Sequence, residues 1–244
     1  MTQPPASGRG DARRDEIAAR LAQVRTRIAA ACEGAGRNVS EITLIAITKT
    51  RPASDVGLLS ELGVTDVGEN RDQEAAPKAA QCARLGLAGL TWHFVGQLQT
   101  NKAASVVRYA DVVHSVDRDR LVRALGHRAR RAGRTITCLV QVSLDADPAR
   151  GGAPADQVPG LADAVAGQGG LVLGGVMAVA PLDEPADAAF GKLADIAAAV
   201  RAAHPGATMI SAGMSDDLEQ AIASGATHLR VGTALLGARS ASVR

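Results

Sequence analysis

The chain of 244 residues carries 46% hydrophobic and 21% charged residues, a composition that is typical of a folded globular protein and excludes a disordered or fibrous one. Its 27 basic and 25 acidic residues leave a formal net charge of +2, so the overall charge does not favour a polyanionic partner. One Trp, one Tyr and two Phe are too few for the aromatic platforms on which single-stranded nucleic acids stack.

Cysteine spacing and the N-terminus indicate the cellular compartment. Cys32, Cys82 and Cys138 lie far apart, and no histidine stands at metal-ligand spacing from them, which argues against a disulfide framework and a metal site. Residues 1–10 are rich in Pro, Gly and Ser, and no segment reaches the roughly 18 apolar residues of a membrane span. We therefore expect a cytoplasmic protein without membrane contact, whose residues 1–10 are disordered.

The first predicted elements are a helix and a buried strand. Over residues 11–32 apolar side chains recur at helical spacing, and the pattern stops at Gly34 and Gly36. The segment ITLIAIT at 42–48 is a continuous apolar run, rich in β-branched residues and too short for a helix. Such a run is typical of a strand that is buried on both faces.

Seven further short apolar strands are predicted, separated by segments with helical periodicity such as 119–131 and 186–203. The predicted strands are 66–68, 92–95, 112–116, 136–142, 171–179, 207–211 and 227–231. Eight alternating units in a chain of this length favour an α/β fold of the (β/α)8 TIM-barrel type, as a single domain over residues 11–244. An open doubly wound sheet is the alternative, although no G-x-G-x-x-G motif follows the first strand.

Lys49 is the first candidate functional residue because it directly follows the first buried strand. In a (β/α)8 barrel, functional residues stand at the carboxyl ends of the strands. Partial desolvation there would favour the neutral amine, which can attack a carbonyl carbon. The alternative is a lysine that merely extends from a strand end into solvent.

Two loops near the C-terminus form the second candidate site. The segments SAGMSDD at 211–217 and RVGTALLG at 230–237 each place small residues at a predicted helix start. Backbone N–H groups there, together with the hydroxyls of Ser215 and Thr233, would suit a phosphate, although simple helix capping is the alternative. Combined with Lys49, the loops predict a ligand with an aldehyde and a phosphate, as pyridoxal 5′-phosphate (PLP) has.

Five motifs extend nearly from end to end: AITKTRP at 46–52, GENRDQE at 68–74, WHFVGQLQTNK at 92–102, GGVMAVAP at 174–181 and SAGMSDDLEQAIASGATHLRVGTALLGAR at 211–239. In this order the set resembles the pyridoxal phosphate homeostasis protein family, single-barrel relatives of the alanine racemase N-terminal domain. The resemblance implies a barrel of that type with an extra N-terminal helix. It also implies a protein that holds and delivers PLP in the cell without substantial catalytic turnover.

The same resemblance implies a set of cofactor-binding residues and no catalytic or metal-binding ones. Lys49 would form the Schiff base, Asn70 would lie near the cofactor ring, and Arg230 would face the pyridine nitrogen. Ser211, Met214, Ser215, Gly232 and Thr233 would surround the phosphate, and the matching motifs add His93 near the pocket floor and Met177.

A PLP-dependent amino-acid racemase of the alanine racemase type is the main alternative function. Such racemases take a second acid–base group, a tyrosine, from a separate C-terminal domain, which we do not expect here. Tyr109, the only tyrosine, is predicted to lie just before the strand at 112–116. Arg230 would leave the pyridine nitrogen unprotonated and the ring a poor electron sink, so we expect at most trace racemase activity.

The arginine-rich segment 118–134 raises nucleic-acid binding as a third class of function. Leu121, Val122 and Leu125 between the arginines are more typical of an amphipathic helix with a solvated face. We therefore expect no nucleic-acid partner. The expected partners are PLP and, transiently, PLP-dependent apoenzymes, and without a dimerising domain we expect a monomer.

Overall fold

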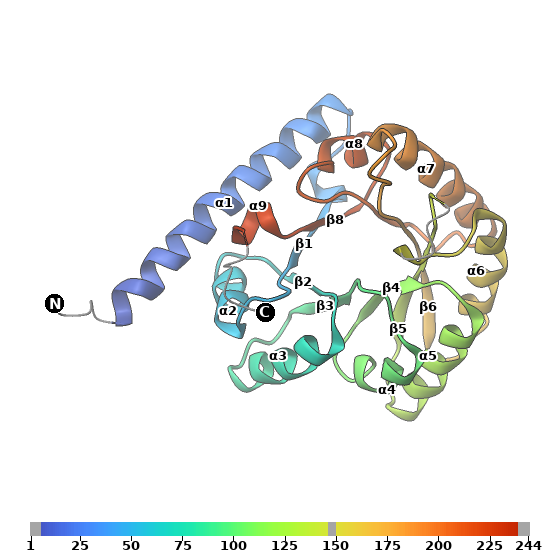
Figure 1. Cartoon of the computed structure of the whole chain (residues 1–244), viewed down its shortest axis with the longest axis horizontal. Coiled ribbons are helices and arrows are strands. Elements are labelled where there is room, and N and C mark those ends of the chain that lie inside the picture. The colour runs from blue at the N-terminus through green and yellow to red at the C-terminus, as the bar shows by residue number, and fades with distance from the viewer. Residues whose placement is uncertain (1–5, 146–149, 239–244) are drawn as a thin grey trace.

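The computed structural model describes residues 6–145 and 150–238. Its strands are β1 (Thr43–Ile47), β2 (Asp66–Glu69), β3 (Thr91–Phe94), β4 (Val112–Val116), β5 (Ile136–Gln141), β6 (Leu171–Met177), β7 (Met209–Ser211) and β8 (His228–Val231). They are parallel and pair in chain order, and β8 pairs with β1 to close the barrel (Figure 1). The predicted (β/α)8 barrel is confirmed, and the open doubly wound sheet is wrong.

Helices outside the barrel connect the successive strands, and a last short helix follows β8 (Figure 1). They are α2 (Ala53–Glu61), α3 (Asp72–Arg84), α4 (Ala103–Val106), α5 (Asp119–Arg131), α6 (Val158–Ala166), α7 (Ala186–Ala203), α8 (Leu218–Ala223) and α9 (Thr233–Leu236). The two helices predicted at 119–131 and 186–203 are confirmed as α5 and α7. The strand ends differ from the predicted ends by one or two residues, as is usual for element boundaries.

An additional helix, α1 (Ala6–Gly34), precedes the barrel. Residues 6–10, which we expected to be disordered, belong to this helix, and residues 1–5 lie outside the described part of the chain. The sequence places Pro4 and Pro5 just before the helix start, where proline is compatible with a helix. A stripe of buried residues packs α1 against α8 and α9, beside β1 (Figure 1). These residues are Ile17, Leu21, Val24, Ile28 and Cys32.

Strand β6 carries a backbone irregularity that only glycine accommodates. Gly175 has φ +146°, and a Cβ atom at this position would lie 2.0 Å from the carbonyl oxygen of Met209 on β7. The register between β5 and β6 shifts beside it, at Cys138 and Leu139. Glycine at this position therefore lets β6 pass close to β7 without a steric clash.

The outer surface agrees with the expectation for the arginine-rich segment. In α5, Leu121, Val122 and Leu125 are buried while Arg123 and Arg128 are exposed, so the helix is amphipathic as predicted. The absence of a nucleic-acid partner stays a prediction. Within residues 6–145 and 150–238, no helix has the length and apolar character that crossing a membrane requires.

Candidate functional site

A cavity of about 350 Å³ opens at the carboxyl ends of the strands. Its walls come from the residues that follow β1, β2, β3, β6, β7 and β8, so segments distant in sequence meet there. Seven of the ten predicted cofactor-binding residues line this cavity: Lys49, Asn70, Met214, Ser215, Arg230, Gly232 and Thr233.

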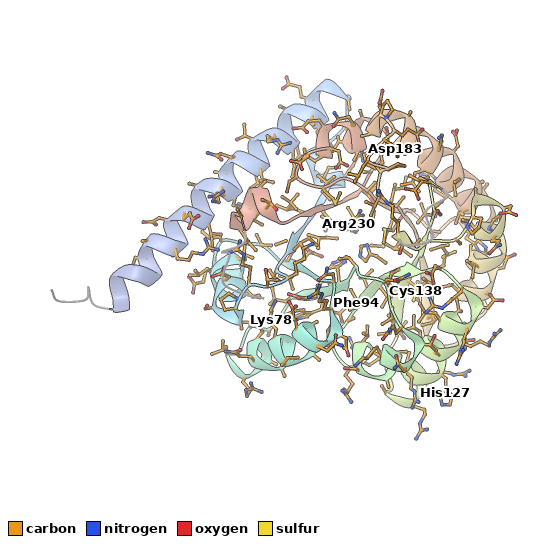
Figure 2. The ribbon with its side chains drawn as sticks, viewed as in Figure 1. Lys78, Phe94, His127, Cys138, Asp183 and Arg230 are labelled. Atoms are coloured by element: carbon orange, nitrogen blue, oxygen red, sulfur yellow. The ribbon has the colours of Figure 1, made fainter. Side chains whose placement is uncertain are left out.

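Lys49 lies in a turn two residues beyond β1. The residue before it, Thr48, is fixed by hydrogen bonds to Glu69 and from Lys78. Thr48 is fully buried, its hydroxyl donates a hydrogen bond to Glu69 Oε1 at 2.6 Å, and its carbonyl oxygen accepts one from Lys78 Nζ at 2.6 Å. Lys78, which is labelled on α3 in Figure 2, also forms an ion pair with Glu69. This buried pair therefore fixes the end of β1 just where Lys49 enters the pocket.

The residue after Lys49 is held as well. Thr50 has φ +64°, a left-handed conformation that costs free energy for a residue with a branched side chain. Its N–H donates to Glu74 Oε2 at 3.0 Å, and the N–H of Arg51 closes the turn on the Thr48 carbonyl at 3.0 Å. The turn 48–51 together with Glu69, Glu74 and Lys78 is called the lysine rim below.

Burial has a marked effect on the carboxyl group of the lysine rim. Glu69 is fully buried, and burial raises the pKa of its carboxyl group despite the neighbouring Lys78. Glu69 Oε2 has no hydrogen-bond partner in the described residues, whereas Oε1 accepts from both Thr48 and Lys78. An unsatisfied oxygen in an apolar environment carries a cost in stability, so the lysine rim holds its geometry at the expense of stability.

Asn70 reaches the pocket from the end of β2 because a glycine leaves room for its backbone. A Cβ atom at Gly96 would lie 2.0 Å from the carbonyl oxygen of Asn70, so the loop after β3 can pass this close only with glycine. Gly96 itself also lines the cavity.

The opposite wall, called the anion rim below, consists of residues 214–216 and 232–233. Ser215 Oγ accepts the N–H of Ala234 at 3.2 Å, which links the two loops. The segment 211–217 opens a helix as expected, because α8 begins at Leu218 with Asp217 as its N-cap. The Asp217 carboxylate accepts the N–H of Met214 at 2.5 Å. Both α8 and α9 are short, so N–H donors rather than long helix dipoles would attract an anion here.

A series of four hydrogen bonds, called the polar wire below, crosses the barrel interior beneath the cavity. Its members are Asp66, His93, His114, Ser211 and Arg230. The distances are 2.9 Å from Asp66 Oδ1 to His93 Nε2 and 2.8 Å from His93 Nδ1 to His114 Nε2. They are 2.9 Å from His114 Nδ1 to Ser211 Oγ and 2.7 Å from Arg230 Nη1 to Ser211 Oγ. Three of its members are predicted site residues: His93, Ser211 and Arg230. Arg230 donates to Ser211 directly, His93 is connected to Ser211 through His114, and Arg230 also lines the cavity.

Arg230 is positioned with little freedom. Its side chain points to the middle of the barrel (Figure 2) and is only 5% exposed, and its Nη2 donates to the carbonyl oxygen of Ala178 at 2.8 Å. Burial lowers the pKa of the guanidinium to about 10, so Arg230 remains protonated at neutral pH. Burial, reinforced by His93 and Arg230, also lowers the pKa of His114 well below its ordinary value, so this imidazole is neutral.

Three predicted residues do not line the cavity. Ser211, predicted beside a phosphate, lies below Arg230 because the last residue of β7 points into the barrel. His93, predicted near the pocket floor, is connected to Ser211 through His114. Met177 packs in the interior with Val112 and Leu139. A direct contact of these three with a ligand stays a prediction.

Sequence reasoning missed several residues of the site. Arg51 lines the cavity and donates from Nη2 to the carbonyl oxygens of Gly237 and Ala238 at 2.7 and 2.8 Å. Its position in the AITKTRP motif, two residues after Lys49, was the available signal. Asp216 also lines the cavity, and nothing in the sequence distinguished it from a helix-capping residue.

Tyr109 does not line the cavity. Its ring packs edge-on against Trp92 with centroids 6.3 Å apart, and its hydroxyl lies 3.5 Å from Asp72 Oδ1. Burial raises the pKa of this phenol well above its ordinary value. Tyr109 is therefore not placed to exchange a proton with a group in the pocket.

Comparisons with known proteins match both the sequence and the fold. The family described as "Alanine racemase, N-terminal domain" matches residues 19–240. The pyridoxal phosphate homeostasis protein of Mycobacterium tuberculosis is 47% identical, over 93% of this chain and 94% of the relative. The protein of the same name from Escherichia coli is 37% identical, over 93% and 99%. The structure of PipY from Synechococcus elongatus with PLP bound is 34% identical, has a TM-score of 0.80 and covers 91% of this chain and 100% of PipY.

Proposed function

The chain belongs to the pyridoxal phosphate homeostasis protein family, and from this membership we propose that it binds PLP at the barrel mouth, holds it and hands it over. The supporting observation is that the amine of Lys49, the guanidinium of Arg230 and the hydroxyls of Ser215 and Thr233 meet at a cavity of about 350 Å³. This donor set fits PLP, because an amine can bond to its aldehyde while N–H and O–H donors bind its phosphate. The cavity also has the size of a small-ligand site.

Lys49 is the residue that would hold PLP covalently. When bound, PLP supplies an aldehyde carbon, which Lys49 Nζ attacks to form a C=N bond with loss of water. The lysine rim supports this role by fixing the main chain on both sides of Lys49. A fixed amine loses less entropy when it reacts than a lysine on a mobile loop.

Two features support holding rather than turnover. Arg230 retains its proton and is proposed to donate to the pyridine nitrogen, which keeps that nitrogen from accepting a proton and makes the ring a weak electron acceptor. Tyr109, the residue type that serves as second base in the related racemases, does not line the cavity. We therefore propose that racemase turnover is negligible.

Borohydride trapping tests the PLP site directly. Protein mixed with PLP should show a visible absorption band that borohydride abolishes, and peptide mapping should place the reduced adduct on Lys49. The Lys49→Ala variant should lose this adduct, while Lys192→Ala, which removes an exposed lysine on α7, should keep it. Wild-type protein that forms no adduct, or an adduct that persists in Lys49→Ala at wild-type yield, would refute the assignment.

Two further measurements test the delivery role. A PLP-dependent apoenzyme mixed with the loaded protein should regain activity, and sedimentation should show the loaded protein as a monomer before transfer. Incubation with PLP and L-alanine should give negligible D-alanine. Rates in the usual enzyme range, on the order of 1 to 1,000 per second, would instead establish a racemase.

A further inference from the structure

The polar wire connects the two ends of the barrel. Asp66 is the first residue of β2, at the amino end of the strands, and lines a second cavity of about 530 Å³ between α1 and the barrel floor. Arg230 lines the cavity at the opposite end. Between them His93, His114 and Ser211 are at most 2% exposed. The wire therefore has polar ends at two cavities and a buried interior.

The chemistry of the two ends determines the direction of every hydrogen bond between them. An arginine can only donate and a carboxylate can only accept. Ser211 Oγ accepts from Arg230, so its own proton is available for His114 Nδ1. His114 then carries its proton on Nε2 and donates to His93 Nδ1, and His93 donates from Nε2 to Asp66. Each group along the wire is satisfied in this direction, with both imidazoles neutral.

The opposite direction needs one additional proton. If His114 donated from Nδ1 to Ser211, its Nε2 would have to accept from His93 Nδ1. His93 would then need a second proton on Nε2 to face the Asp66 carboxylate, and the Ser211 hydroxyl proton would lose its acceptor. Although burial acts to raise it, hydrogen bonds from His93 and Thr65 bring the pKa of Asp66 below its ordinary value, so the anion that selects the direction is present at neutral pH.

We propose that the polar wire is a positioning device for the cofactor pocket, in which Asp66 at the barrel floor orients Ser211 and thereby fixes the guanidinium of Arg230 against its ligand. This inference rests on the proposed PLP site and adds His93, His114 and Asp66 as positioning residues. The oriented Ser211 oxygen and the Ala178 carbonyl each take one Arg230 donor, which leaves the other N–H groups of the guanidinium for the ligand. The ligand-facing donors are thus set by a residue at the other end of the barrel.

The first test reads the direction of the wire without any cofactor. Nitrogen-15 NMR of the imidazole rings should show His93 and His114 as neutral Nε2–H tautomers, with the signals assigned through a His114→Phe variant. A proton on Nδ1 of His114 at neutral pH would overturn the proposal. Because this measurement uses the free protein, it stands even if the proposed PLP site fails.

The second test breaks the wire at the end that is remote from the pocket. Asp66→Ala should weaken PLP binding about three- to tenfold, which corresponds to the net contribution of one hydrogen bond. It should also shift the absorption maximum of the bound cofactor. Asp66→Asn retains an acceptor for His93 and should restore most of the affinity. The matched control is Asp163→Ala, which removes an equivalent carboxylate contact to His204 Nε2 at 2.8 Å on the protein surface.

The outcomes separate this inference from the proposed function. A wild-type protein that binds PLP, together with an Asp66→Ala variant of unchanged affinity and spectrum, would refute the positioning role and leave the PLP site intact. Equal losses in Asp66→Ala and Asp163→Ala would also refute it, because a general loss of stability would then be the cause. A loss in Asp66→Ala alone, recovered in Asp66→Asn, would support it.

Discussion

The lysine rim and the anion rim face each other across one cavity but are held in different ways. The lysine rim is fixed by side chains from α3 and β2, including a buried ion pair, and its main chain is anchored before and after Lys49. The anion rim lies in the two loops that lead into the short helices α8 and α9, is linked across these loops by Ser215 and Ala234, and includes the partly exposed Met214. One wall is therefore anchored from beneath by buried side chains, and the other is held by contacts nearer the surface.

This difference suggests a division of labour in cofactor handling. A rigid amine is suited to forming and breaking one covalent bond in a fixed place. A lightly held anion site can release its ligand with little rearrangement, because few protein contacts have to break. We therefore expect the lysine rim to determine whether PLP is held covalently, and the anion rim to determine how quickly it leaves.

The largest effect is expected from breaking the lysine rim. Lys78→Met removes the partner of a fully buried carboxylate and the donor to the Thr48 carbonyl. Loss of one member of a buried ion pair costs about 3 kcal/mol or more, so the free energy of unfolding in urea should fall by that amount. The yield of borohydride-trapped adduct on Lys49 should fall as well.

The double variant Lys78→Met/Glu69→Gln provides the control. With no charge left behind, most of the lost stability should return, whereas the adduct yield should stay low because Thr48 still lacks its donor. A single variant as stable as the wild type would contradict the description of the lysine rim as a wall anchored by buried side chains.

A smaller effect is expected from adding charge to the anion rim. Ser215→Asp places a carboxylate where the phosphate is proposed to bind and should weaken PLP binding about tenfold to a hundredfold by repulsion. Stability should change little, because Ser215 is only half-buried. Ser224→Asp, beyond the end of α8, is the matched control. Equal affinities of the two variants for PLP would show that the phosphate does not bind at Ser215.

Acid should change the stability contributed by His228 and by Glu69 with opposite sign. Burial, reinforced by the nearby His93, lowers the pKa of His228 on β8 to about 4, so the unfolded chain binds more protons and stability is lost as the pH falls from about 6.5 toward 4. Burial raises the pKa of Glu69, so its contribution is present at low pH and is lost as the pH rises. The stability advantage of the wild type over His228→Gln should shrink on the order of 1–2 kcal/mol over that window.

Urea unfolding at pH 7, 5.5 and 4 measures this difference. The Glu69→Gln variant should change its stability relative to the wild type in the opposite direction over the same pH range. A constant difference between the wild type and His228→Gln would show that His228 takes up its proton equally well in the folded and unfolded chain.

The smallest effect on PLP binding is expected from removing the contact of α1 with the anion rim. Arg27 on α1 donates from Nη1 to the Ser215 carbonyl at 2.9 Å and forms a two-point ion pair with Glu219 at 2.8 and 2.9 Å. Arg27→Ala should raise the rate of PLP release about two- to threefold and cost less than about 1 kcal/mol of stability. Arg25 lies on the same helix as Arg27 and donates to the carbonyl oxygen of Leu62. Arg25→Ala removes this donor and should leave the release rate unchanged.

The sequence was sufficient to predict the strands and two of the three cationic residues that line the pocket. Each strand is a short apolar run, so period and length identified it, and Lys49 and Arg230 follow from their places in β1 and β8. The helix opened by segment 211–217 was predicted correctly, but the contact of the Asp217 carboxylate with the N–H of Met214, in place of a cap on α8, could not be foreseen from the sequence. The meeting of His93, His114 and Ser211 was not foreseeable, because it depends on how β3, β4 and β7 face one another inside the closed barrel.

The position of α1 has a consequence for biosynthesis. This first helix packs mainly on α8 and α9, and β1 pairs with β8 as well as with β2, so the opening segment of the chain meets part of its partners only after nearly all of the described chain has been made. At about 5–20 residues per second, the ribosome needs roughly 10–40 seconds to cover the interval between β1 and β8. During that interval the apolar stripe of α1 is uncovered, so we expect the nascent chain to depend on chaperones until its last strand emerges.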